Sequence, residues 1–266
     1  MLMQQTRLLT IPLNLGGYSH FVDSIFELAT KRTSSYVCVA NVHTCVESYR
    51  NKDFSNAIAQ ADMVTPDGMP LNLALRWLYQ LKQERIAGPD LMPVLLRESE
   101  KRKLKVFFYG CTQEVLDTIK EKCRVDYPQL EIAGMISPPY RALTNEEVLS
   151  YQQTINDSGA NLVLVSLGCP KQERWMASMK GKIDAVMIGV GAAFPMMAGV
   201  ERRAPRWMQR VCLEWLFRML CNPRRLFKRY VVTNTYFLYL LLLEKFRLSL
   251  FSPPITPQRR IVEYYI

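Results

Sequence analysis

The chain has 266 residues, and its 49% hydrophobic and 22% charged residues are proportions typical of a globular protein, which excludes wholesale disorder. Its net charge of +10 indicates an anionic partner, such as nucleic acid, anionic lipid or a phosphorylated substrate. With only 2 His residues and no CxxC pair among its 7 Cys residues, the sequence excludes a multi-histidine metal centre and argues against a zinc site.

The amino-terminal segment, MLMQQTRLLTIPLNLGG, lacks the continuous apolar core of a signal peptide because Pro12, Asn14 and two glycines interrupt it. No later stretch reaches the roughly 20 apolar residues that cross a bilayer. The nearest approach is the segment 236–243. We therefore expect a cytoplasmic protein.

Short apolar runs alternate with longer amphipathic segments from residue 36 onward. The runs predict strands at 36–41, 63–65, 106–109, 131–136, 162–167 and 185–190, and the segments between them predict helices at 44–59, 71–81, 90–101, 113–124, 146–156 and after residue 173. Strands that alternate with helices in this way predict a doubly wound, mostly parallel, Rossmann-like α/β sheet.

A carboxylate follows the second of these strands: Asp67, in the TPDG turn that begins at Thr65, which is itself a candidate for substrate contact. Ligands of open α/β sheets bind outside the carboxyl ends of the strands, so Asp67 is placed to act as a general base. The alternative is a turn or helix-cap aspartate before Pro70. Asn41 and His43 follow the preceding strand and should lie beside Asp67, although a lone histidine is more often a structural hydrogen bonder than a base.

Three other strands end in glycines, which leave room for a phosphate or a sugar to approach the backbone. These glycines are Gly110, Gly168 and Gly191. The loop after the strand at 162–167 also carries three polar candidates for substrate contact, Lys171, Gln172 and Glu173. The sequence therefore predicts a binding site at the carboxyl edge of the sheet.

Missing motifs limit the chemistry of that site. No GxGxxG fingerprint is present, so a dinucleotide cofactor is poorly supported. No Asp-x-Asp pair is present either, so a carboxylate clasp for a metal-bound nucleoside diphosphate is not evident. Cys169 lies in the same loop and could be a nucleophile. Because the sequence places no base near it, we interpret Cys169 as a small residue of the loop.

The composition changes after about Gly199, because 11 Lys or Arg residues stand against 3 Glu residues between Glu201 and Phe251. Helical spacing predicts a basic face with Arg203, Arg206 and Arg210, and an apolar face with Trp207, Val211 and Trp215. This pairing is typical of a helix in a membrane interface, and a docked helical pair with a solvated basic rim is the alternative. We expect an α/β catalytic domain at 1–199, a basic amphipathic appendage at 200–251 and a tail at 252–266.

Nine short motifs stand in order between about Tyr36 and Tyr230: NVH at Asn41, TPDG at Thr65, RIAGPDL at Arg85, FFYG at Phe107, LGCPKQE at Leu167, IGVGAAF at Ile188, RRAPRWM at Arg202, LEWLFRM at Leu213 and NPRRLFKRY at Asn222. Together they resemble the WecG/TagA/CpsF glycosyltransferases (glycosyltransferase family 26). Chance does not account for nine collinear motifs.

The resemblance implies transfer of a sugar from a UDP-sugar to a polyprenyl-diphosphate-linked sugar, in the synthesis of a bacterial surface polysaccharide. The donor sugar would be of N-acetylmannosamine type, its uronic acid or a hexose. Transfer inverts the anomeric centre to give a β-linkage and needs no metal or other cofactor. The expected location is the inner face of the cell membrane, as a peripheral protein. No nucleic acid is expected as a partner, and a homo-oligomer is left open.

The resemblance also assigns residues. Asp67 matches the base that deprotonates the acceptor hydroxyl, and Arg85 and Gln172 match polar residues of the same pocket, as does Asn41. Residues of the appendage match the basic side chains that neutralise a diphosphate: Arg218, Arg225 and Lys228. Cations near the leaving UDP fit the physics of a transfer without a metal.

Two positions depart from the family pattern. The family commonly has Thr where Val39 stands, and Asp where Pro195 stands. A donor contact near the nucleotide therefore differs, or the donor carries another sugar. The SPPYR segment at Ser137 resembles a subset of exopolysaccharide-type members without identifying the sugar.

Two other classes compete with the glycosyltransferase. A nicotinamide-dependent oxidoreductase shares the sheet but needs a dinucleotide loop that this chain lacks. A nucleic-acid-binding protein explains the charge, but Trp207, Trp215, Phe217 and Phe227 lie in a helical, Leu-rich context and not on a stacking platform. Titration with UDP, NAD and an oligonucleotide separates the three.

Overall fold

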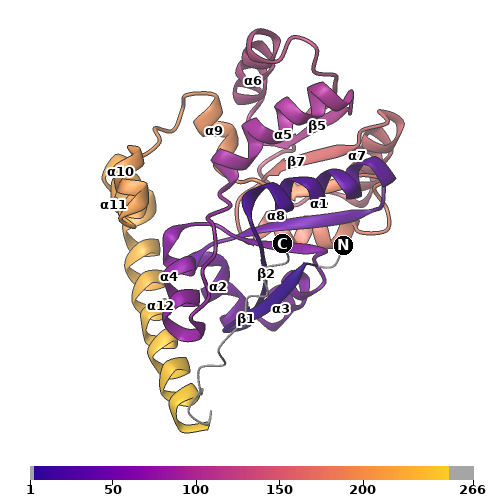
Figure 1. Cartoon of the computed structure of the whole chain (residues 1–266). Coiled ribbons are helices and arrows are strands. Elements are labelled where there is room, and N and C mark those ends of the chain that lie inside the picture. Colours follow the sequence, from indigo (N-terminus) through magenta and orange to yellow (C-terminus); the bar gives the residue numbers. More distant parts are fainter. Residues whose placement is uncertain (1–2, 252–266) are drawn as a thin grey trace, which may run out of the picture.

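The structure, a computed structural model, describes residues 3–251. Its centre is a six-stranded sheet in which each neighbouring pair of strands is parallel (Figure 1). The strands lie in the order β4 (Met63–Pro66), β3 (Ser35–Ala40), β8 (Val186–Gly189), β7 (Leu162–Ser166), β5 (Val106–Gly110) and β6 (Ile132–Ile136). The predicted α/β class and the positions of these strands are confirmed, to within one residue at each end.

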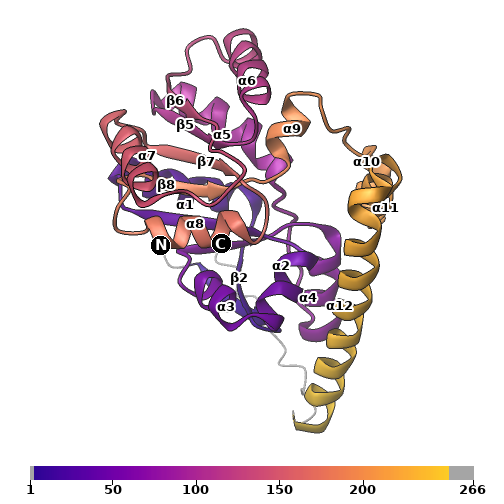
Figure 2. The same cartoon turned by 180° about the vertical axis from the view of Figure 1, so that it is seen from behind.

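Helices cover both faces of the sheet because its strands are apolar on both sides (Figure 2). Along β3, Tyr36 and Cys38 face one core, whereas Val37 and Val39 face the other. The first core takes α2 (Val42–Arg50), α3 (Lys52–Ala59), α4 (Met69–Tyr79), α7 (Asn145–Asp157) and α8 (Lys171–Met179). The second takes α1 (Tyr18–Lys31), α5 (Gly88–Arg102), α6 (Gln113–Asp126) and α9 (Ala193–Met197).

The connections create a crevice at the carboxyl ends of β3 and β8. These strands are neighbours in the sheet, but α2 follows β3 on one face and α9 follows β8 on the opposite face. Helices that diverge from adjacent strands leave open the place where ligands of α/β sheets bind.

The single helix predicted at 44–59 is wrong, because the structure has two helices there, α2 and α3. Asn51 separates them, with extended backbone angles of φ −130° and ψ 111°. Its side-chain oxygen accepts a hydrogen bond from the backbone N–H of Phe54 at 2.8 Å, which caps α3. A good amino-terminal cap therefore outweighs the continuous helical pattern.

The amino-terminal region holds structure that the sequence patterns did not predict. β1 (Gln4–Leu8) and β2 (Ile11–Leu15) form an antiparallel hairpin, and α1 follows it. Asn14 is buried, and its side-chain oxygen accepts a hydrogen bond from the backbone N–H of Val64 at 2.8 Å. This bond attaches the hairpin to the edge strand β4.

The carboxyl-terminal appendage consists of α10 (Arg206–Arg210), α11 (Glu214–Cys221) and α12 (Pro223–Phe251), and α12 lies alongside α2 and α4 (Figure 1). The prediction of one basic and one apolar face on a single continuous helix is wrong, because α10 ends at Arg210 and α11 begins at Glu214. Arg203 precedes α10, and Cys212, with a φ of 62°, lies in the break before α11. No helix within residues 3–251 is both long and apolar enough to cross a membrane. The tail predicted at 252–266 lies outside the described residues.

Candidate active site

A cavity of about 1610 Å³ lies between the carboxyl ends of the strands and the appendage. Loops that follow β3, β4, β5, β7 and β8 line one wall, and side chains of α11 and α12 line the other. Pockets for one small molecule typically measure about 300–1,000 Å³. The cavity therefore has room for two substrates side by side.

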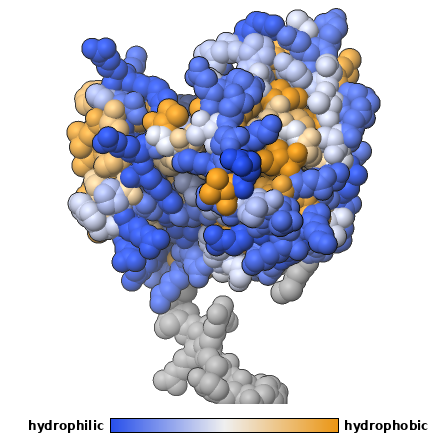
Figure 3. Space-filling view, turned by 90° about the horizontal axis from the view of Figure 1, so that it is seen from above, coloured by the Kyte–Doolittle hydropathy of each residue, from blue (hydrophilic) through white to orange (hydrophobic). Residues whose placement is uncertain are grey.

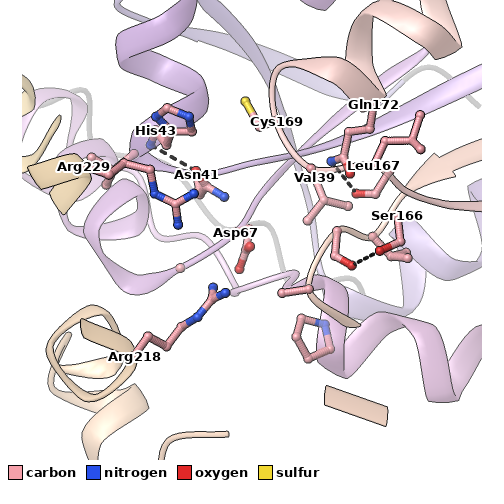
Figure 4. Close-up of a pocket in the computed structure, with 18 of the residues that line it drawn as sticks. Val39, Asn41, His43, Asp67, Ser166, Leu167, Cys169, Gln172, Arg218 and Arg229 are labelled. Atoms are coloured by element: carbon pink, nitrogen blue, oxygen red, sulfur yellow. Dashed lines mark hydrogen bonds between the residues drawn. The ribbon is translucent and has the colours of Figure 1, made fainter. Parts of the chain in front are cut away.

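Asp67 lies on the cavity wall immediately after β4. Its backbone N–H donates to the carbonyl oxygen of Ala40 at 2.7 Å, and Gly68, with a φ of 94°, turns the chain into α4. Its half-buried side chain points into the cavity, with Arg218 of α11 reaching toward it (Figure 4). Asp67 therefore lies where the sequence predicts it, in the crevice at the carboxyl ends of the strands.

The surroundings of Asp67 favour its protonated form. Burial, and next the negative charge of Glu214, raise the pKa of Asp67 to about 7, against the opposing charges of Arg85 and Arg218. A carboxylate with a pKa near 7 exchanges a proton readily at neutral pH, as a general base must.

Asn41 and His43 lie beside Asp67, as expected (Figure 4). The side-chain oxygen of Asn41 accepts hydrogen bonds from the backbone N–H groups of His43 at 3.0 Å and Thr44 at 3.3 Å, so it caps α2. Burial and the charge of Arg229 lower the pKa of His43, which keeps its imidazole neutral at pH 7. The Nδ1 atom of His43 is buried and has no hydrogen-bond partner within residues 3–251.

Gln172 and Glu173 are the most buried polar residues of the strand-end wall, with exposures of 4% and 1%. Nε2 of Gln172 donates to Oε1 of Glu173 at 2.9 Å, and burial raises the pKa of Glu173. The amide oxygen of Gln172 faces Gly191, where a Cβ atom would lie 3.6 Å away. Glu173 therefore orients Gln172, whose amide oxygen is buried and has no hydrogen-bond partner within residues 3–251. The other two predicted members of this loop, Gly168 and Lys171, also line the cavity.

Cys169 is better explained as a structural residue than as a nucleophile. It lies in the same loop, and burial, reinforced by the charge of Glu173, raises the pKa of its thiol well above the ordinary value. A thiol in that state holds its proton at neutral pH and is a poor nucleophile.

The appendage contributes three arginines to the cavity. Arg218 of α11 and Arg225 of α12 line it as predicted, and both bind the carboxylate of Glu201, at 3.2 Å and 2.5 Å. Lys228 is exposed and is not among the lining residues, but the neighbouring Arg229 is. Arg229 follows Arg225 by four positions, so helical spacing could have identified it in place of Lys228.

Three further predicted site residues lie behind the cavity wall. The guanidinium group of Arg85 binds Asp90 at 2.5 Å and Glu214 at 2.9 Å, which joins α5 to α11. Thr65 is fully buried, and Gly110 packs so closely on the carbonyl oxygen of Ser166 that a Cβ atom would lie 2.3 Å from it. Their positions suit support of the site better than contact with a substrate.

The remaining wall contains aromatic residues that the strand-end pattern did not identify. The Nζ atom of Lys171 lies 4.4 Å from the ring centre of Tyr140, and the rings of Tyr109 and Trp175 stack at 4.1 Å. Tyr140 belongs to the SPPYR segment, which lines the cavity with the two departures from the family pattern, Val39 and Pro195. This end of the cavity has flat apolar surfaces suited to a base or a sugar ring.

No group of three or more His, Cys, Asp or Glu side chains within residues 3–251 is arranged to hold a metal ion. The charged side chains on the cavity wall are instead arginines, Lys171 and carboxylates that do not form such a group.

Known proteins that are similar to this chain include the members of one family and two named relatives. Residues 6–250 match the family described as "Glycosyl transferase WecG/TagA/CpsF family". Two similar relatives carry the name N-acetylglucosaminyldiphosphoundecaprenol N-acetyl-beta-D-mannosaminyltransferase. The relative from Bacillus subtilis strain 168 is 28% identical over 95% of this chain and 97% of its own length. The relative from Bacillus spizizenii strain W23 is 31% identical over 72% of this chain and 73% of its own length. The chain belongs to the WecG/TagA/CpsF family of glycosyltransferases.

Proposed function

We propose that this glycosyltransferase moves a sugar from a UDP-sugar to a polyprenyl-diphosphate-linked sugar, with inversion to a β-linkage and without a metal ion. The names of the relatives support the acceptor class and the β-linkage, since both describe β-transfer of N-acetylmannosamine to a diphosphoundecaprenol-linked sugar. The observation that carries the proposal is Asp67, a carboxylate with a pKa near 7 on the wall of a cavity that is also lined by three arginines of the appendage.

Asp67 is the base in this proposal. Its carboxylate takes the proton of the acceptor hydroxyl while the hydroxyl oxygen attacks the anomeric carbon of the donor. The bond between that carbon and the diphosphate oxygen breaks on the opposite face, and the anomeric configuration inverts. Gln172 and Asn41 lie within the same wall and orient the sugar.

The arginines take the place of a metal ion. Arg218, Arg225 and Arg229 present guanidinium groups to the cavity, where they stabilise the negative charge of a diphosphate. Arg218 and Arg229 reach from the appendage toward the space beside Asp67 (Figure 4). Arg85 supports this arrangement indirectly, since it fixes Glu214 at the start of α11.

The lipid end of the acceptor fits the apolar end of the cavity. Leu73 and Trp77 of α4 face Leu238 and Leu242 of α12 along the lining, and all four are at least 43% exposed. A prenyl chain that lies between these helices would bury this surface, which is the driving force for binding it.

The appendage is also the proposed contact with the membrane. Leu238, Leu242, Phe246 and Leu250 recur every four residues along one side of α12, and each is at least 60% exposed. Hydrophobic residues are also exposed at the left edge of the molecule in Figure 3, where α10 and α11 lie. An apolar helix face flanked by arginines suits the interface of an anionic bilayer. We place the enzyme at the inner face of the cell membrane.

A donor screen tests the function directly. The full-length protein is incubated with a panel of UDP-sugars and a short-chain polyprenyl-diphosphate sugar, and the products are identified by mass spectrometry. The proposal predicts one added sugar, with release of UDP, for one class of donor. Binding of NAD or of an oligonucleotide in place of UDP, with no glycosylated product, would refute it.

A further inference from the structure

A groove between α4 and α12, which lie side by side (Figure 1), extends the cavity away from Asp67. Its lining is apolar on both helices: Leu73, Ala74 and Trp77 on α4, and Phe237, Leu238, Leu241 and Leu242 on α12. Nearer to its start, α12 presents Arg225 and Arg229 to the same cavity. The groove therefore changes from cationic to apolar along α12.

Lys245 closes the far end of this groove. Its Nζ atom donates to the backbone carbonyl oxygen of Trp77 at 3.3 Å and lies 5.7 Å from the centre of the Trp77 ring. In the described part of the chain, which ends at Phe251, no residue of α12 after Leu242 lines the cavity. The contact between Lys245 and Trp77 joins the two helices at this point, so the groove has a defined length.

Helix geometry gives the length of the path from the arginines to the closed end. From Arg229 to Leu242, α12 advances about 20 Å, at a rise of about 1.5 Å per residue. An extended chain advances by about 1.2 Å per bond, so an isoprenoid unit, which adds four bonds to the chain, takes about 5 Å. The path therefore matches about four isoprenoid units.

The shape of the groove favours a chain that continues beyond it. Phe237 and Leu241 are buried and form its floor, whereas Leu73, Trp77, Leu238 and Leu242 are between 43% and 61% exposed. The groove is thus open along one side, and a ligand that lies in it would cover apolar surface that now faces solvent. The arginines at the other end require that the same ligand carry an anionic group. A prenyl chain joined to a diphosphate has both properties.

We propose that the groove determines how much of the acceptor lipid the enzyme recognises. It binds about the first four isoprenoid units after the diphosphate, and Trp77 contacts the last of them. The inference rests on the proposed function, in which Arg225 and Arg229 bind the diphosphate of the acceptor. Units beyond the fourth leave through the open side of the groove and stay in the bilayer. Trp77 is therefore a specificity-determining residue for the length of the prenyl chain.

Sugar transfer to acceptors of different length tests the proposal. The full-length protein is assayed without a membrane, with prenyl-diphosphate sugars of two, three, four and six isoprenoid units, each below its critical micelle concentration. The KM for the acceptor should fall several-fold with each unit up to four, because each unit buries more apolar surface. It should stay the same from four units to six. A KM that is independent of length, or that keeps falling from four units to six, would overturn the proposal.

Trp77→Ala tests the far end of the groove. The KM for the four-unit acceptor should rise roughly 10-fold, whereas the KM for the two-unit acceptor, which does not reach Trp77, should not change. The unchanged value also shows that the variant folds, and the hydrogen bond from Lys245 persists because it goes to the backbone. Trp77→Phe should restore most of the difference. The matched control is Leu149→Ala, an exposed apolar residue of α7 outside the cavity. An equal increase for both acceptors would show a merely structural role.

Binding without transfer separates this proposal from the proposed function. Geranyl diphosphate has two isoprenoid units and geranylgeranyl diphosphate has four, and both are titrated calorimetrically into the full-length protein. The longer probe should bind more tightly, and Trp77→Ala should remove most of the difference. That result without any sugar transfer refutes the proposed function alone. Transfer with equal affinity for both probes refutes the proposal for the groove alone and assigns the groove to another occupant, such as a lipid acyl chain.

Discussion

The two walls of the cavity are held in place by different forces. On the strand-end wall, Gln172 and Glu173 are almost fully buried and joined by a hydrogen bond, and the cap of α2 fixes Asn41. On the appendage wall, ion pairs with Glu201 hold Arg218 and Arg225, and no residue of α11 is buried. Segments with few buried contacts open at the lowest free-energy cost. We infer that the α/β wall fixes the reacting groups, while α11, which lacks the buried residues of α12, adjusts around the proposed diphosphate.

The largest effect should come from the fixed wall. Asp67→Asn removes the proposed base but keeps the size of the side chain, so turnover should fall roughly 100-fold or more. The melting temperature and UDP binding should stay close to those of the wild type. Near-normal turnover of this variant would return Asp67 to the role of a turn residue.

The next effect should come from the adjustable wall. Replacing both Arg218 and Arg225 with Gln removes charge from the proposed diphosphate site, and kcat should fall by roughly 10- to 1,000-fold. Most binding to anionic liposomes should persist, because the apolar residues of α12 are unchanged. Arg124→Gln on the outer surface of α6 is the control. Equal losses of liposome binding and catalysis would show that the two tasks of the appendage cannot be separated.

The pH dependence should reveal contact between the walls. As the proposed base, Asp67 must be unprotonated to act. Its pKa is raised to about 7, so kcat/KM should decline as the pH falls below about 7. Glu214 is a cause of that increase, and Glu214→Gln removes its negative charge. The acidic limb of the profile should therefore move to lower pH in this variant. A limb that stays in place or moves to higher pH would contradict the coupling between α11 and Asp67.

The smallest effect should concern the membrane. Phe246→Ser with Leu250→Ser removes apolar surface that is exposed on α12, at 64% and 61%. Sedimentation with anionic liposomes should decrease by several-fold, because each lost apolar side chain weakens interfacial binding. Activity on a water-soluble short-chain acceptor should change by less than binding does. A variant that sediments like the wild type would place the membrane contact elsewhere.

Sequence patterns predicted the strand-end wall better than the appendage, for a physical reason. Apolar runs that end in Gly or Asp identify strand ends, and parallel strands bring those ends to one edge, so Asp67, Asn41 and Gln172 were placed together correctly. In the appendage, the side chains that enter the cavity are determined by which side of each helix faces the sheet. A helical pattern alone did not show that Arg229 rather than Lys228 enters the cavity.

Three-dimensional pairing explains the other differences. The family resemblance assigns Arg85 to the pocket, but Asp90 and Glu214, which approach from other elements, hold it behind the wall. Helical spacing predicts that Arg203 shares a face with Arg206, but Arg203 precedes α10 and pairs with Asp90 at 2.5 Å. Neither pairing leaves a periodic trace in the sequence. The division of the chain into domains at 1–199 and 200–251 stays a prediction.

The central claim is that Asp67 and the arginines together perform an inverting transfer without a metal ion. Its most direct test is the anomeric configuration of the product formed in excess EDTA, determined by NMR on the product of the active UDP-sugar. The account predicts a β-linkage formed at an undiminished rate. An α-linked product, or loss of product that manganese or magnesium restores, would contradict it.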